Sequence, residues 1–173
     1  MYALPAPTVL TVEDDPIVRA DLRLVLEDAG FDVCADARDG VEAVVLARKH
    51  RPDVILLDLN LPRIDGVEAA RRIRSERNVP IVALTAHSEE GFVERALDAG
   101  ASSCVLKPFG EEELVDALRG ALVTHADQVI NRQRAESRQT IAVMLRALGQ
   151  PEAWAADLED RMYRAGRLWR EAD

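Results

Sequence analysis

The sequence has few aromatic residues, few cysteines and no long apolar run. Only 4% of the 173 residues are aromatic, so the core must be built mainly from Val, Leu, Ile and Ala. Two cysteines are too few for a disulfide framework in a chain of this length. No apolar run approaches the length of a membrane span, and no basic segment followed by such a run marks a secretory signal. We therefore expect a cytoplasmic protein without a membrane partner.

Basic residues are also scarce compared with acidic ones. The chain has 22 Lys and Arg against 31 Asp and Glu, a formal net charge of −9. Residues 124–173 contain eight arginines and eight acidic residues, so residues 1–123 carry the whole net charge. DNA-binding modules are usually basic, which makes DNA an unlikely partner. Only two lysines occur, Lys49 and Lys107, whereas arginine fills the other basic positions.

Short apolar runs alternate with helix-length segments over about the first 120 residues. The runs are 9–12, 31–37, 54–57, 81–85 and 103–106. They show little polar alternation, which is typical of strands buried on both faces of a parallel sheet. Pro16 suits the first turn of a helix, and Gly30 suits the position just after its end. This order predicts an α/β fold, an open five-stranded parallel sheet with right-handed crossovers.

The last fifty residues have no strand signal. A helical pattern that begins at residue 111 continues to about residue 148, and Pro151 can begin another helix. That second helix would place four large apolar side chains on one stripe, namely Trp154, Leu158, Met162 and Trp169. Such a stripe must be buried on this subunit or on another. We predict a helical extension over residues 124–173, used for association or partner binding.

Polar side chains that suit phosphoryl chemistry lie at four of the predicted strand ends. In chain order they are Glu13, Asp14, Asp15, Asp58, Thr85 and Lys107. Ligands of open parallel sheets bind at the carboxyl ends of the strands. Carboxylates gathered there repel one another and need a cation, and oxygen ligands suit Mg²⁺. A carboxylate beside Mg²⁺ and an ammonium group can attack phosphorus and form an aspartyl phosphate.

Each of these residues has a structural explanation when it is taken alone. Asp14 or Asp15 could cap the helix that begins near Pro16, and Thr85 could simply end a strand. The functional interpretation depends on their joint occurrence at the proper strand ends, with one of only two lysines among them.

Four motifs together resemble the receiver domains of two-component response regulators. They are residues 12–16 (VEDDP), 58–66 (DLNLPRIDG), 84–86 (LTA) and 107–109 (KPF). The resemblance covers about residues 7–123. It implies a flavodoxin-like, doubly wound sheet of strand order 2-1-3-4-5, to which the helical extension 124–173 is added.

The resemblance also implies a role for each matching position. Asp58 matches the phosphoacceptor. The implied Mg²⁺ ligands are Glu13, Asp14, Asp58 and the backbone carbonyl of Asn60. The switch and phosphoryl-binding positions are Thr85, Ala86 and Lys107, and the Lys107–Pro108 peptide bond is expected to be cis. The implied partner is a sensor histidine kinase or a histidine phosphotransfer protein. The implied chemistry is limited to the domain's own phosphorylation and dephosphorylation, so we do not expect an enzyme.

One position departs from the family pattern. Receivers usually have an aromatic residue three positions before the lysine, and this chain has Cys104 there. His87 lies close to the acceptor in such domains and could tune loss of the phosphoryl group, or it could be an ordinary surface residue. In the implied strand order Cys34 and Cys104 fall on opposite edges, about 19 Å apart at roughly 4.8 Å per strand spacing, too far for a disulfide.

Several outputs are compatible with the C-terminal segment. The helices could drive formation of a homodimer, dock a partner, or fold back on the receiver. An RNA-binding antiterminator module of the ANTAR type is an alternative, because residues 85–100 resemble receivers found with that module and residues 136–141 resemble its start. A haloacid-dehalogenase-type enzyme needs Asp-x-Asp, but this chain has Asp58-Leu59-Asn60. We expect a phosphorylation-activated switch whose C-terminal helices change their association.

Overall fold

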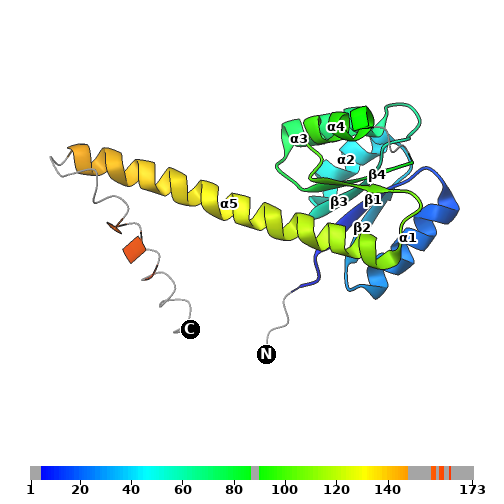
Figure 1. The fold of residues 1–173 in the computed structure, drawn as a ribbon, viewed down its shortest axis with the longest axis horizontal. Helices are drawn as coiled ribbons and strands as arrows, with labels where there is room; N and C mark the ends of the chain where they lie inside the picture. Colours follow the sequence, from blue (N-terminus) through cyan, green and yellow to red (C-terminus); the bar gives the residue numbers. More distant parts are fainter. Residues whose placement is uncertain (1–4, 87–89, 148–156, 159, 162–163, 165–173) are drawn as a thin grey trace. The chain divides into compact units, whose positions relative to one another are not determined.

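The computed structural model describes residues 5–86 and 90–147, together with residues 157, 158, 160, 161 and 164. The chain divides into two compact units, residues 1–125 and 126–173. Strands and helices alternate along the first unit (Figure 1). The strands are β1 Thr8–Val12, β2 Asp32–Ala37, β3 Val54–Asp58, β4 Ile81–Thr85 and β5 Ser103–Leu106. The helices are α1 Pro16–Asp28, α2 Gly40–His50, α3 Gly66–Glu76, α4 Glu90–Asp98 and α5 Glu111–Ala147.

The five strands form one parallel sheet in the order β2-β1-β3-β4-β5. The predicted α/β fold and strand order are therefore confirmed. The order reverses at β1, since the chain moves outward to β2 and then returns past β1 to β3. Cys34 in β2 and Cys104 in β5 lie on opposite edges of the sheet, and both are free thiols.

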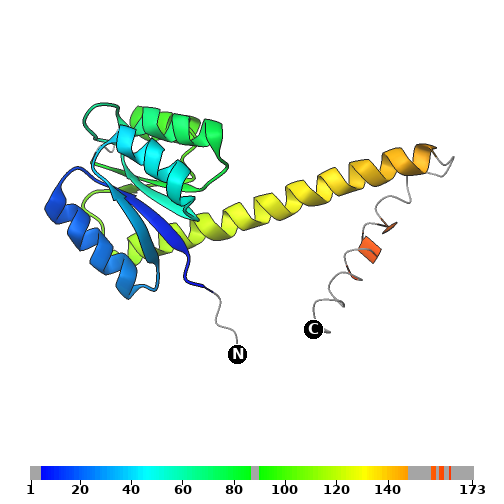
Figure 2. The same cartoon turned by 180° about the vertical axis from the view of Figure 1, so that it is seen from behind.

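Helices cover both faces of the sheet (Figures 1 and 2). Successive residues of the central strands point to opposite faces of the sheet. Val9 packs in an apolar cluster with residues of α1 and α5, whereas Leu10 packs in a second apolar cluster with residues of α2, α3 and α4. Both faces are thus apolar, as the unbroken apolar runs predict. Phe31 is the one aromatic among the buried core residues that the structure describes, and the rest are Val, Leu, Ile and Ala.

Local signals in the sequence account for the start of α1. The Asp15 carboxylate accepts hydrogen bonds from the backbone N–H groups of Ile17 (2.7 Å) and Val18 (3.2 Å), and Pro16 occupies the first helical position. Asp15 is therefore an N-cap, which is the structural role considered for it above. The helix is followed by Gly30 at φ 87°, where the left-handed backbone favours glycine.

Helix α5 is 37 residues long and changes character along its length. Leu114 and Leu118 are fully buried near its start, whereas residues 131–140 are all exposed. None of the described helices combines the length and the apolar character needed to cross a membrane. From the predicted association stripe, Trp154, Met162 and Trp169 lie outside the described residues. Leu158 lies in a helical stretch and is 38% exposed.

Candidate functional site

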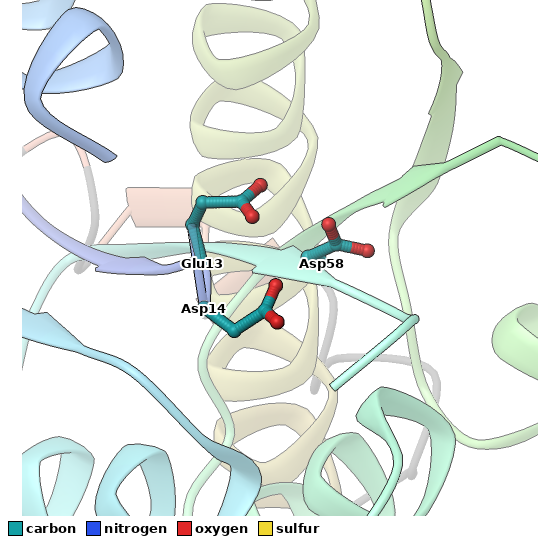
Figure 3. A group of neighbouring side chains, drawn as sticks. All are labelled: Glu13, Asp14 and Asp58. Atoms are coloured by element: carbon teal, nitrogen blue, oxygen red, sulfur yellow. The ribbon is translucent and has the colours of Figure 1, made fainter. Parts of the chain in front are cut away.

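The ends of β1 and β3 bring three carboxylates together (Figure 3). Asp58 is the last residue of β3, and Glu13 and Asp14 follow β1 directly. One oxygen from each of the three side chains lies within 4.8 Å of the others. Glu13 and Asp58 are 2% and 4% exposed, while Asp14 faces solvent. The predicted gathering of these residues at the carboxyl edge of the sheet is what the structure shows.

Lys107 reaches the two buried carboxylates from the end of β5. Its Nζ donates to Oε2 of Glu13 at 2.8 Å and to Oδ2 of Asp58. Its backbone N–H donates to the carbonyl of Thr85 at 2.8 Å, which fixes the loop beside the end of β4. The Lys107–Pro108 peptide bond is cis. The lysine is therefore held at both its main chain and its side chain.

Further contacts fix the Asp58 side chain and the turn that follows β3. Its Oδ1 accepts a hydrogen bond from the Asn60 N–H at 2.8 Å, so both carboxylate oxygens have donors. Leu59 continues the sheet beyond the strand by donating to the carbonyl of Leu84 at 2.9 Å. Gly66, at the start of α3, packs against this turn: a Cβ there would lie 2.5 Å from Cα of Leu59 and closer still to the carbonyl oxygen of Asp58.

The crowding at Gly66 was not visible in the sequence, where this glycine marks only the start of a helical segment.

A second residue that the sequence did not single out is Arg19 in α1. Its Nη1 donates to the backbone carbonyls of Glu13 and, at 3.2 Å, of Asp14. Arg19 thereby fixes the loop that presents both acidic side chains. Nothing in the spacing of Arg19 distinguishes it from the other helical arginines.

Burial and charge act in opposite directions on the ionisable groups of the cluster. Burial raises the pKa of Glu13, the hydrogen bond from Lys107 lowers it, and the charge of Asp58 raises it, with a net increase. Burial lowers the pKa of Lys107, but its hydrogen bonds to Asp58 and Glu13 outweigh this effect and leave the pKa raised. Lys107 is therefore charged at neutral pH. One ammonium group against three carboxylates leaves a formal charge of −2, which favours a divalent cation.

The remaining predicted site residues lie around the end of β4. Thr85 is the last residue of β4 and is fully buried, while Ala86 after it is exposed. His87 lies outside the described residues. Cys104 in β5 is half-buried and packs against the apolar cluster that Phe92 of α4 also contacts. Burial raises the pKa of the Cys104 thiol.

The response regulator receiver domain family matches residues 9–119. The chain belongs to this family. The match spans the sheet, the acidic cluster and Lys107, so the resemblance seen in the motifs is confirmed.

Two curated relatives and one solved structure illustrate the family relationship. The chain is 36% identical over 159 residues to the transcriptional regulatory protein PdtaR of Mycobacterium tuberculosis, covering 84% of this chain and 78% of PdtaR. It is 41% identical over 120 residues to the DNA-binding response regulator MtrA of Mycolicibacterium smegmatis, covering 69% of this chain and 52% of MtrA. The receiver domain of sensor histidine kinase PA1611 from Pseudomonas aeruginosa PAO1 is similar, with 38% identity and a TM-score of 0.62 over 68% of this chain and 98% of that one. The PA1611 structure has a magnesium ion coordinated in its active-site cleft.

Proposed function

We propose that this receiver accepts a phosphoryl group on Asp58 from a histidine kinase or a histidine phosphotransfer protein. The observation that carries the proposal is the environment of the Asp58 carboxylate. One of its oxygens accepts from Lys107 and the other from the N–H of Asn60, and two further carboxylates lie within 4.8 Å. A carboxylate that only closed a strand would need none of these partners.

The residues of the cluster fit Mg²⁺. The carboxylates of Glu13, Asp14 and Asp58 are hard oxygen ligands that suit a divalent cation, and the backbone carbonyl of Asn60 is proposed as a fourth oxygen ligand. When bound, the ion would supply positive charge that offsets the charge of the phosphoryl oxygens. The match to the PA1611 receiver, whose structure holds magnesium, supports the same assignment.

Phosphoryl transfer needs only one bond to form and one to break. An oxygen of Asp58 attacks phosphorus, the P–O bond forms, and the P–N bond of the donor phosphohistidine breaks with its electron pair left on the imidazole nitrogen. Lys107, already in contact with Asp58 and Glu13, then pairs with a phosphoryl oxygen. The Thr85 hydroxyl, at the neighbouring strand end, is proposed to hydrogen-bond another. The contribution of the protein is mostly positioning and charge.

Intact mass spectrometry with a small phosphoryl donor and Mg²⁺ tests the acceptor. The wild-type chain is expected to gain one phosphoryl group, and Asp58→Asn none. Asp32→Asn is the matched control, because Asp32 is exposed at the start of β2, the opposite end of the sheet. Undiminished phosphorylation of Asp58→Asn would remove the site assignment.

The proposed output of this cytoplasmic switch is a change in self-association through the C-terminal helices. Helix α5 leaves the adjacent side chains of Val143 and Met144 each 60% exposed, which gives a partner helix an apolar surface to bind. Phosphorylation is expected to shift the protein between monomer and homodimer, as measured by light scattering. Thr85→Ala should take up the phosphoryl group without the shift. A phosphorylated wild-type chain that stays monomeric would contradict this output.

A second candidate output is regulation of transcription through RNA, by an ANTAR-like module. This candidate is supported by the alignment to PdtaR, a transcriptional regulatory protein. Because the alignment covers 84% of this chain, it must extend to at least about residue 145, well past the receiver match at residues 9–119. The C-terminal segment therefore shares sequence with a transcriptional regulator. Electrophoretic mobility shifts with RNA, compared for the phosphorylated chain and for Asp58→Asn, distinguish this output from association alone.

A further inference from the structure

A small cavity lies between the ends of α2 and α3, at the edge of the sheet away from the acidic cluster. The two helices pack side by side on one face of the sheet (Figure 1). Helix α3 begins against Asp58 and runs back along the sheet, so its last residues lie at the opposite edge. The cavity has a volume of about 160 Å³. Its walls combine the apolar side chains of Val44, Ala47 and Ile73 with three arginines and one glutamate.

The arginines of this cavity differ in whether their side chains have a hydrogen-bond partner. Arg48 of α2 and Glu76 of α3 pair across the cavity through two hydrogen bonds, of 3.0 and 2.6 Å. Glu76 is therefore already engaged. Arg77, the residue after α3, has its Nη1 buried without a hydrogen-bond partner among the residues that the structure describes. A buried donor without an acceptor is destabilising, more so when the group is charged, so it calls for an explanation.

The third arginine, Arg51, adds an independent observation. It caps the end of α2 with φ 52°, one of two described non-glycine residues in the left-handed region, and its N–H donates to the carbonyl of Ala47 at 3.1 Å. Glycine would occupy this conformation at no cost. The chain instead places a second positive charge beside Arg77. Burial and the charge of Arg51 both lower the pKa of Arg77.

Asp53, the acidic residue whose charge could offset these arginines, already accepts hydrogen bonds from another segment. The charge of Asp53 also reaches Arg77, but Oδ2 of Asp53 accepts from both the backbone N–H and the hydroxyl of Thr8, each at 2.8 Å. Arginines at a helix C-terminus ordinarily interact with its exposed carbonyl groups. That interaction does not account for a buried Nη1 that meets no acceptor.

We infer that this cavity binds a small free oxyanion of the phosphate or carboxylate class, with Arg77 and Arg51 as its ligands. The planar guanidinium fork matches two oxygens of such an anion. A cavity of about 150 Å³ holds a molecule of the size of benzene, so this one has room for a small anion such as phosphate. The inference does not depend on phosphorylation of Asp58.

Thermal unfolding of the full chain in inorganic phosphate tests the site. Phosphate is titrated against chloride at equal ionic strength, with EDTA present, and the series is repeated in Asp58→Asn so that the acidic cluster does not contribute. We expect a saturable rise in Tm with phosphate, since a ligand that binds only the folded state stabilises it. Arg77→Gln should raise the half-saturating concentration at least tenfold. Arg71→Gln, an exposed arginine of α3 paired with Glu68, is the matched control and should leave it unchanged.

The stability of Arg77→Gln without phosphate separates a binding role from a structural one. If Arg77 serves to bind an anion, Arg77→Gln is at least as stable as wild type in chloride. Its Tm then rises less than that of wild type when phosphate is added. A variant that is less stable in chloride and responds to phosphate as wild type does would overturn the inference. The inference would also be overturned if the Tm of the wild-type chain did not rise with phosphate, or if it rose equally with chloride.

Discussion

Neutralising Asp14 should stabilise the metal-free protein and remove its response to Mg²⁺. Asp14 is exposed, and its carboxylate oxygen lies within 4.8 Å of oxygens from Glu13 and Asp58. At that separation each repulsion is worth about 1 kcal/mol in a water-like dielectric and about 3.5 kcal/mol at an effective dielectric constant of about 20. The lower figure applies to an exposed group. The ammonium group of Lys107 contacts Glu13 and Asp58 and offsets part of their negative charge, so Asp14→Asn should raise the free energy of unfolding by about 1 kcal/mol.

Urea unfolding at low salt, with EDTA or with Mg²⁺, measures both parts of this prediction. At a free Mg²⁺ concentration ten times its Kd, wild type should gain about 1.4 kcal/mol. Asp14→Asn should lose most of that gain, because a carboxylate ligand has been replaced by an amide. Asp32→Asn, exposed at the far end of β2, should behave as wild type does. The reasoning fails if Asp14→Asn is destabilised in EDTA, or if it keeps the full Mg²⁺ response.

Three further variants test other features of the structure. Gly66→Ala should lose about 1–3 kcal/mol in urea unfolding, because its Cβ would meet backbone atoms at the end of β3, whereas Gly91→Ala in α4 has open space and should not lose stability. Lys107→Gln should lose about 3–5 kcal/mol in EDTA, because it leaves two buried carboxylates without their cation, and Mg²⁺ should restore more stability to it than to wild type. Burial, Arg74 and Arg77 lower the pKa of His125 from its ordinary 6.5, so its contribution is present above that pH and is lost as pH falls through the lower folded value. His125→Gln should therefore flatten the decline in stability below pH 6.5, and exposed His50→Gln should not.

The fold could be predicted from the sequence because its signals are local. Runs such as 54–57 are apolar at every position, as both faces of their strand are covered, and Pro16 and Gly30 mark the ends of α1. The acidic cluster could be predicted because strand ends of a parallel sheet meet at one edge, whatever the details of packing. Predicting the cluster required only knowing which residues follow each strand.

The features that were not predicted depend on contacts between distant segments. That Gly66 must lack a Cβ follows from how closely α3 approaches the end of β3, which no spacing in the sequence encodes. Arg19 is one of many helical arginines until the structure places it on the carbonyls of Glu13 and Asp14. The same holds for Arg77, since its unpartnered Nη1 results from the packing of α2 against α3.

Lys107 connects the ends of four strands. Its main chain is bonded to the carbonyl of Thr85 at the end of β4, it follows β5, and its ammonium group contacts Glu13 and Asp58 after β1 and at the end of β3. Any group that draws the ammonium away from these carboxylates changes how strongly they attract a cation. In the function proposed above, cation binding and modification of Asp58 would therefore be thermodynamically linked, and by reciprocity each would alter the equilibrium of the other by the same factor.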